Sequence, residues 1–236
     1  MELKLAIAKV DKYGAENSGD TVEVIERLNG GISIVLGDGQ IDGRNKKYIS
    51  NIVSHRVIEH ISSGVSDGAA IRSASNSIFS EFNGRVQANL NVISVDLQTN
   101  RIILLRNTPA PIFLIDNGNV DCLTAASEPI GGRENISPSI IELQIEPDMA
   151  IIAFSDGVMN AGRNLRQDTD ICLIIETLID EEDLSARQIA ELLLTRAIRL
   201  DNDRPQDNMS VIVLMISPLT TDNIRRINVS LSLDEA

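Results

Sequence analysis

Apolar and polar residues alternate along much of this chain with the period of two that is typical of strands in antiparallel sheets. Alternation, or a short buried-type apolar run, predicts strands over the following ranges: Leu3–Val10, Thr21–Arg27, Ile32–Leu36, Ala88–Leu97, Arg101–Arg106, Pro111–Ile115, Val120–Leu123, Ile140–Ile145, Ala150–Phe154, Met209–Ile216 and, as a last edge strand, Ile224–Leu231. Short turns separate several of them, such as Asn29-Gly30-Gly31 and Asn117-Gly118, because Asn and Gly tolerate the positive φ that tight turns need.

Other segments have the spacing of amphipathic helices. Between Lys46 and Ser62, apolar residues recur every fourth position, which places them on one helical face. Similar patterns predict helices over Gly68–Phe82, Ile171–Ile179 and Ala186–Leu200, the last with Ser185 as its N-cap. Neighbouring strands joined by short turns, together with paired helices, imply an α+β fold in which helices cover antiparallel sheets. No linker divides residues 1–236, so we expect one domain.

Composition excludes several classes of function. The 236 residues carry 21 Lys and Arg against 34 Asp and Glu, a net charge of −13 without any basic run. Such a chain is poorly suited to binding nucleic acid or an anionic membrane. The longest apolar run, Val211–Ile216, is far shorter than a membrane span, and Cys122 and Cys172 lack metal or redox spacing. The N-terminus lacks the apolar core of a signal peptide. We therefore expect a cytoplasmic protein with reduced cysteines.

Four aspartates lie where predicted strands begin or end. Two of them, Asp38 and Asp156, follow strands, and two, Asp20 and Asp207, precede strands. In an antiparallel pair, the end of one strand lies beside the start of its partner. A two-residue turn at Asn29-Gly30 would place Asp20 opposite Gly39 and beside Asp38, although the extra Gly31 can shift this register by one residue. Asp156 and Asp207 meet in the same way only if their strands are antiparallel neighbours, which the sequence leaves open.

Four carboxylates at one sheet edge would repel one another strongly unless cations neutralise them. The stretches GDGQIDG, FSDGV and QDNMS contain no Lys or Arg, so divalent cations are the natural neutralisers. Ligand sets made only of oxygen favour Mg²⁺ or Mn²⁺ over zinc. Any single Asp-Gly step after a strand is more often an ordinary turn. The occurrence of all four aspartates in suitable strand contexts is what predicts a metal site.

The segments that contain these aspartates resemble, in chain order, the motifs of the metal-dependent serine/threonine phosphatases of the PPM (type 2C) family. The matching stretches are Asn17-Ser18-Gly19-Asp20, Leu36-Gly37-Asp38-Gly39, Ala153-Phe154-Ser155-Asp156-Gly157-Val158 and Asp207-Asn208-Met209-Ser210. Two softer matches, Arg106–Pro111 and Glu128–Gly131, are similar to segments of the bacterial SpoIIE/RsbX-like branch of that family. The resemblance covers nearly the whole chain.

The resemblance implies two stacked antiparallel sheets flanked by helices, with a core at about residues 3–217 and a C-terminal strand or tail over 218–236. It also implies two Mn²⁺ or Mg²⁺ ions per chain, whose bridging water attacks phosphorus in line without a phosphoenzyme. Asp38 would bridge both metals and Gly39 would offer its carbonyl. Asp156 and Asp207 would hold the second metal. Asp20 would bind one metal directly or through water, and no other catalytic residue is implied.

The chain departs from the family pattern beside the second motif. Many relatives have a His just after the Asp-Gly step or a few residues later, where this chain has Gln40 and Asp42. Its only histidines, His55 and His60, lie on a predicted helix, and we expect both to be surface or packing residues. A His that acts as general acid beside the metals is therefore absent, which leaves protonation of the leaving group without an assigned residue.

The function implied by the resemblance is hydrolysis of phosphoserine or phosphothreonine in a phosphoprotein. The Arg that gathers the substrate phosphate in some relatives has no counterpart, and Lys9 or Lys12 is the candidate replacement. Without a sensor or membrane domain, the chain most resembles stand-alone RsbX-like phosphatases of bacterial stress-signalling complexes, the stressosomes. Those enzymes act on STAS-domain regulators, which are therefore the expected partners.

Two other functions stay open at this point. Because Gln40 and Asp42 stand where relatives have His, the chain is alternatively a catalytically weak or dead regulator that keeps the fold and binds partners. A third reading is a metal-dependent phosphodiesterase, because pairs of metals held by carboxylates cut nucleic acids as well. The net charge of −13 argues against that third reading. The pattern does not indicate an oligomeric state.

Overall fold

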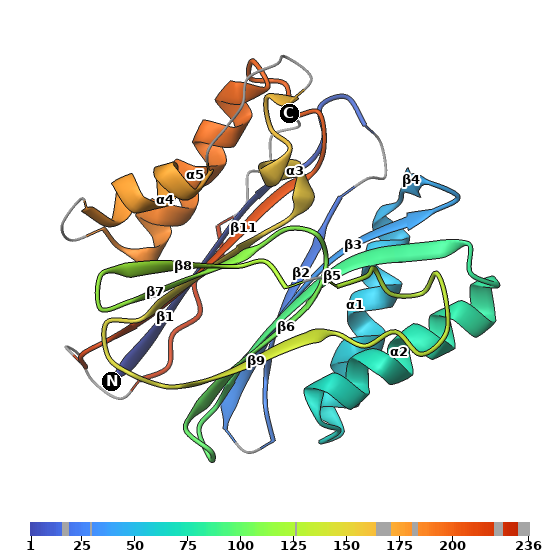
Figure 1. Ribbon diagram of the computed structural model, residues 1–236, viewed down its shortest axis with the longest axis horizontal. Coiled ribbons are helices and arrows are strands. Elements are labelled where there is room, and N and C mark those ends of the chain that lie inside the picture. Colours follow the sequence, from blue (N-terminus) through green and yellow to red (C-terminus); the bar gives the residue numbers. More distant parts are fainter. Residues whose placement is uncertain are drawn as a thin grey trace.

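The protein is seen in a computed structural model that describes residues 1–15, 19–28, 30–125, 127–163, 171–180, 184–219 and 224–230. Two antiparallel sheets pack face to face, and helices cover both outer faces (Figure 1). The predicted α+β sandwich of stacked sheets between helices is therefore confirmed.

The first sheet contains both ends of the folded core. Its strand order is β1-β11-β10-β7-β8, with bounds β1 (Glu2–Val10), β11 (Met209–Ser217), β10 (Ala150–Phe154), β7 (Ile112–Asp116) and β8 (Asn119–Leu123). β1 pairs with β11 along its whole length, from Glu2 opposite Ser217 to Val10 opposite Met209. β10 lies on the other side of β11 and is also antiparallel to it. These pairings confirm the neighbour relation that the sequence left open.

The second sheet is built on one long strand. Its order is β2-β3-β5-β6-β9, and the short β4 pairs with β3; the bounds are β2 (Thr21–Glu26), β3 (Gly31–Ile41), β4 (Arg44–Asn45), β5 (Val86–Asp96), β6 (Arg101–Asn107) and β9 (Ser139–Gln144). β3 pairs with β5 from Gly31 opposite Asp96 to Ile41 opposite Val86. β3 thus continues beyond its predicted end at Leu36, and Asp38 lies inside a strand rather than in a turn.

Two pairs of helices cover the sandwich, as the sequence predicts. Helices α1 (Lys47–Ser62) and α2 (Asp67–Phe82) lie on the second sheet, and α4 (Ile171–Asp180) and α5 (Ala186–Leu200) lie on the first (Figure 1). The short α3 (Asp156–Met159) follows β10 directly. Ser185 caps α5 in a capping box with Gln188, which confirms the predicted N-cap. None of the described helices is long and apolar enough to cross a membrane.

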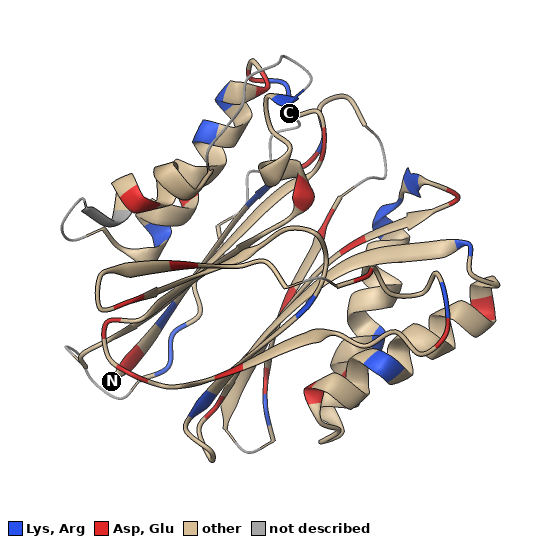
Figure 2. Ribbon diagram, viewed as in Figure 1, with Lys and Arg blue, Asp and Glu red and all other residues tan. Residues whose placement is uncertain are grey.

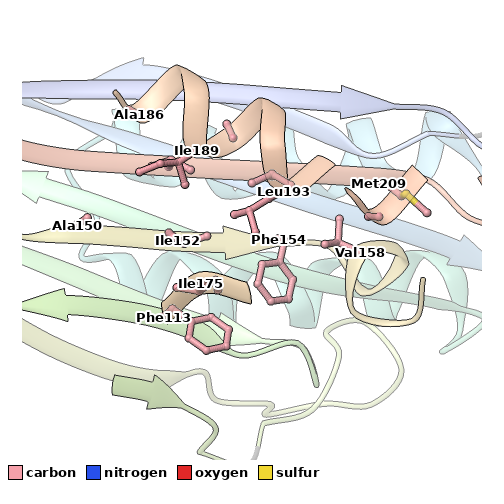
Figure 3. Close-up of a cluster of buried hydrophobic side chains, with 14 of the residues drawn as sticks. Phe113, Ala150, Ile152, Phe154, Val158, Ile175, Ala186, Ile189, Leu193 and Met209 are labelled. Carbon is pink, nitrogen blue, oxygen red and sulfur yellow. The ribbon is translucent and has the colours of Figure 1, made fainter. Parts of the chain in front are cut away.

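Three apolar clusters hold these layers together. One lies between the first sheet and its helices, where the Phe113 and Phe154 rings are 5.9 Å apart and Ile175 of α4 packs nearby (Figure 3). A second lies under α1 and α2, and a third fills the space between the sheets. The third cluster includes Ile34 and Leu36 of β3. Asp38 follows two residues later, so the row of side chains facing the other sheet changes from apolar to acidic.

The C-terminal segment differs from its prediction. Residues 224–230 form no strand, so the expected edge strand Ile224–Leu231 is wrong for them, and Leu231 is outside the described residues. Ile227 and Val229 are 83% and 88% exposed, so the apolar alternation has no sheet face to cover. The predicted motif and turn residues Asn17, Ser18 and Asn29 are also outside the described part of the chain.

Candidate metal centre

The second sheet brings Asp20 and Asp38 together. Thr21 pairs with Gly37 at the end of the β2–β3 ladder, so the next step places Asp20 opposite Asp38 itself. The turn chemistry had predicted Asp20 opposite Gly39, and the register is therefore shifted by one residue. A hydrogen bond from the Arg27 amide to the Gly31 carbonyl closes a connection that is longer than the predicted two-residue turn. The shift puts both carboxylates on the same face of the sheet, in adjacent strands.

Glycines on both sides of Asp38 let α1 lie directly against β3. A Cβ at Gly37 would be 2.4 Å from Ser54 Oγ, and one at Gly39 would be 2.6 Å from Ile49 Cγ2. Side chains alternate across a strand, so the two glycines face α1 whereas Asp38 faces the first sheet. Glycine at these two positions therefore has a packing role, because it gives α1 room to support the strand that carries Asp38.

The first sheet brings Asp156 and Asp207 together. Phe154 of β10 pairs with Val211 of β11, and beyond that pair the Ser155 amide donates to the Ser210 carbonyl at 3.0 Å. Asp156 begins α3 and Asp207 lies just before β11. A Cβ at Gly157 would lie only 2.0 Å from the carbonyl oxygen of Asn208, the residue that follows Asp207. Only glycine permits this close approach of the two segments.

Hydrogen bonds to carboxylates connect the two sheets at this end of the sandwich. The Ser210 hydroxyl of the first sheet donates to Asp20 Oδ2 at 2.7 Å. Asn89 and Asn45 of the second sheet donate to Asp156 and Asp207 at 3.2 Å and 3.0 Å. Sequence reasoning missed both asparagines, because nothing in their local pattern indicates that they face aspartates distant in sequence.

Burial and mutual repulsion shift the titration of the cluster. Burial first, and then the charges of Asp20, Asp156 and Asp207, raise the pKa of Asp38 from the usual 3.8 to about 8. Burial also raises the pKa of Asp20 to about 6, against hydrogen bonds from Ser210 and Ser155. The pKa of Asp156 is raised mainly by burial and next by Asp207. The four predicted aspartates therefore form one electrostatic cluster.

The donor set fits a hard divalent cation. Asp20 and Asp38 each have a buried Oδ1 without a hydrogen-bond partner, which leaves two acceptor atoms unsatisfied. All candidate ligands are oxygens, as Mg²⁺ and Mn²⁺ prefer. Among the described residues, no three His, Cys, Asp or Glu side chains converge closely enough to form a ready-made metal site. The four carboxylates nevertheless lie close enough to influence one another's pKa, and a hydrogen bond with Asp38 is among the contacts that act on the pKa of Asp156.

Two ammonium groups lie beside the carboxylates. Lys9 Nζ donates to the Asp20 carbonyl oxygen at 3.0 Å, and Lys47 Nζ donates to the same oxygen. Burial, followed by the charge of Lys9, lowers the pKa of Lys47. Basic residues also gather around β4 and the start of α1 (Figure 2). Lys9 was a sequence candidate for phosphate binding, whereas Lys47 was missed because a Lys in the first turn of a helix has no distinguishing pattern.

Residues at which the chain departs from the family motif are engaged elsewhere. Gln40 pairs with Asn45 in the β3–β4 ladder, and Asp42 forms an exposed ion pair with Arg85. His55 is exposed on α1, where its Nε2 lies 3.5 Å from Glu23, as expected for a surface residue.

The softer motif Arg106–Pro111 supports the architecture. The buried Arg106 guanidinium donates to the carbonyls of Ala110, Leu123 and Ala125. Asn107 Nδ2 donates to the Glu128 carbonyl at 2.8 Å. These bonds fasten the β7–β8 hairpin and the segment after it to β6, which lies two strands away from Asp38 in the second sheet.

Comparison with known proteins agrees with this architecture. The family model described as Stage II sporulation protein E (SpoIIE) matches residues 28–217. Stage II sporulation protein E of Priestia megaterium is 23% identical over 208 residues, which are 88% of this chain and 35% of that protein. The chain thus spans about a third of the length of this curated relative.

Solved structures share the same fold. The PP2C phosphatase domain of SpoIIE from Bacillus subtilis, solved with a fragment of its regulatory domain, has a TM-score of 0.76 and 21% identity over 93% of this chain and 64% of that one. The catalytic domain of the serine/threonine phosphatase PstP, in complex with two manganese ions, has a TM-score of 0.70 and 16% identity over 92% and 99%. RsbX in complex with magnesium has a TM-score of 0.67 and 12% identity over 91% and 96%.

Proposed function

This chain belongs to the stage II sporulation protein E (SpoIIE) family, whose solved domain is a PP2C phosphatase, and we propose that it is a metal-dependent serine/threonine phosphoprotein phosphatase. The observation that carries the proposal is that the two sheets place Asp20, Asp38, Asp156 and Asp207 at the same end of the sandwich, where Asp20 and Asp38 each have a buried Oδ1 without a hydrogen-bond partner. Unpaired buried carboxylate oxygens are costly unless a cation binds them.

The proposed ligand roles follow the predicted motifs. Asp38 would hold both ions, Asp156 and Asp207 would hold the second, and Asp20 would hold one directly or through water. The Gly39 carbonyl already accepts a hydrogen bond from the Lys46 amide at 3.0 Å. A carbonyl oxygen has two lone pairs, so the other remains available to a metal. These roles are supported by the oxygen-only donor set and by the glycines that admit close backbone approach.

Two Mn²⁺ or Mg²⁺ ions, once bound, would acidify a water and neutralise charge on the phosphoryl group. The chain's own residues supply the remaining functions. Lys9 and Lys47 present ammonium groups beside Asp20, where they can attract the substrate phosphate. Neither His55 nor His60 is assigned a catalytic role, so the proposal includes no histidine general acid.

The proposed substrate is a phosphoserine or phosphothreonine protein, with STAS-domain stress-signalling regulators as the specific class. That class rests on the resemblance to RsbX-like enzymes, together with the likeness of the fold to RsbX. A cytoplasmic location is proposed as well, because both Cys122 and Cys172 are free thiols, as is usual in a reducing compartment.

Hydrolysis of p-nitrophenyl phosphate and of a phosphoserine STAS-domain protein, measured against Mn²⁺ concentration, tests the proposal. We expect metal-dependent turnover that Asp38→Ala lowers by at least about 100-fold. Asp121→Ala, which removes an exposed aspartate of β8, is the matched control and should retain activity. Full activity in excess chelator would refute the proposal. Mn²⁺ binding without turnover on either substrate would instead favour a catalytically dead regulator, the alternative motivated by Gln40 and Asp42.

A further inference from the structure

Two asparagine amides reach from the second sheet to carboxylates of the first. Asn45 Nδ2 of β4 donates to Asp207 Oδ1 at 3.0 Å, and Asn89 Nδ2 of β5 donates to Asp156 Oδ2 at 3.2 Å. The Ser210 hydroxyl makes the reciprocal bond, from the first sheet to the second. Every one of these three links ends on a carboxylate oxygen, so they orient the acidic groups while they connect the sheets.

The position of Asn89 follows from strand pairing. Asn89 lies directly opposite Asp38 in the β3–β5 ladder, so both side chains face the gap between the sheets. Burial and three neighbouring carboxylates raise the pKa of Asp38, and a hydrogen bond from Asn89 acts in the opposite direction. An amide nitrogen has two N–H donors. The side chain of Asn89 therefore serves one aspartate from each sheet.

Asn45 acts on the other carboxylate of the first sheet. β4 is only two residues long, and it is held against β3 by the pairing of Asn45 with Gln40. Asp207 Oδ1 accepts from both Asn45 Nδ2 and the Asn208 amide, the latter at 2.9 Å. No described residue donates to Asp207 Oδ2. One oxygen of Asp207 is thus held by two donors, while the other remains available.

A neutral donor is suited to this position. Carboxylates that bind metals are commonly oriented by further hydrogen bonds, and loss of such a partner typically costs about 10–100-fold in metal affinity. A Lys or Arg here would also donate, but its charge would neutralise the carboxylate and compete with the cation. An amide orients the oxygen and leaves its negative charge for the metal.

We propose that Asn45 and Asn89 are positioning residues of the metal centre, which hold Asp207 and Asp156 of the opposite sheet so that their other oxygens can bind the cations. The inference rests on the proposed function for the identity of the ligands. It adds two residues outside the four motifs, and it makes the spacing of the two sheets part of the metal site.

Mn²⁺ affinity of the full chain, measured by isothermal titration calorimetry, tests the inference without relying on catalysis. We expect Asn45→Ala and Asn89→Ala to weaken binding by about 10–100-fold. Gln87→Ala, which removes an exposed amide from the same strand as Asn89, is the control and should stay within about twofold of the wild type. Circular dichroism in EDTA establishes that each variant is folded.

A second pair of variants separates donation from packing. Asn89→Leu keeps a similar shape without donors and should behave as the Ala variant does, whereas Asn89→Gln keeps the amide and should recover part of the affinity. Folded Ala variants that bind Mn²⁺ within twofold of the wild type, equal losses for Leu and Gln, or a wild type that binds no Mn²⁺ would each overturn the inference. Weakened binding in the Ala variants of a protein that hydrolyses no phosphoprotein would leave the inference standing and refute the proposed function.

Discussion

Replacing Asp38 by asparagine is expected to stabilise the protein without metal and to destabilise it relative to the wild type when Mn²⁺ is present. The pKa of Asp38 is raised from 3.8 to about 8, and that of Asp20 to about 6, so folding takes up protons between these values. Stability that comes from a raised acid pKa is fully present below 3.8 and is lost as the pH rises toward 8. Metal-free wild type should therefore lose stability from pH 4 to pH 8.

The magnitude follows from the linkage relation. One unit of pKa corresponds to about 1.4 kcal/mol. Ionisation of Asp38 alone would therefore lower the free energy of unfolding by up to about 4 kcal/mol at neutral pH, and this is an upper bound because the carboxylates titrate as a set. Asparagine removes the charge but leaves a buried amide poorly paired, which costs about 1–3 kcal/mol. Removal of the charge is the larger effect. In EDTA at about pH 8, the free energy of unfolding of Asp38→Asn should therefore exceed that of the wild type by about 1–3 kcal/mol.

Mn²⁺ should reverse the order of the two proteins. At about 1,000 times its Kd, a ligand stabilises the folded state by about 4.1 kcal/mol, which exceeds the variant's advantage of about 1–3 kcal/mol, and Asp38→Asn should lose most of that stabilisation. The assay is urea denaturation at about pH 5 and pH 8, in EDTA and in Mn²⁺, followed by circular dichroism because the chain has no Trp. A variant less stable than the wild type in EDTA at about pH 8, or a metal-free wild type whose stability does not change with pH, would refute the reasoning.

Three further outcomes are expected. Gly157→Ala should lower the unfolding free energy by at least about 2 kcal/mol and weaken Mn²⁺ binding, because its Cβ would lie 2.0 Å from the Asn208 carbonyl oxygen; an unchanged urea midpoint would argue against that contact. Asp42→Ala should leave the hydrolysis rate within about twofold, since its exposed ion pair with Arg85 contributes little; a tenfold loss would instead assign Asp42 a catalytic role. Ser185→Ala should cost about 1 kcal/mol in urea denaturation through the lost N-cap, and a changed Mn²⁺ affinity would show that α5 is coupled to the centre.

Local signals predicted most of the secondary structure. Alternating strands, four-residue helical spacing and the Ser185 cap depend on neighbours within a few positions. The structure confirms them, and in most of the helices and strands the observed ends differ from the predicted ends by no more than two residues. The exception at β3 has a physical cause. Gly37 and Gly39 are weak strand formers, but their missing side chains allow α1 to pack on the strand, and that tertiary contact outweighs local propensity.

The sequence by itself determined the α+β class and identified the four aspartates as candidate ligands, because hydrophobic periodicity and short acidic motifs are local properties of the chain. Only the tertiary structure decided that Asp20 lies opposite Asp38 rather than Gly39, and that Asn45 and Asn89 reach aspartates of the other sheet. It also brought the thiols of Cys122 and Cys172, which no spacing rule connects, into interaction. Such contacts join strands or layers far apart in the sequence, and they depend on a register and a packing that no short window of residues contains.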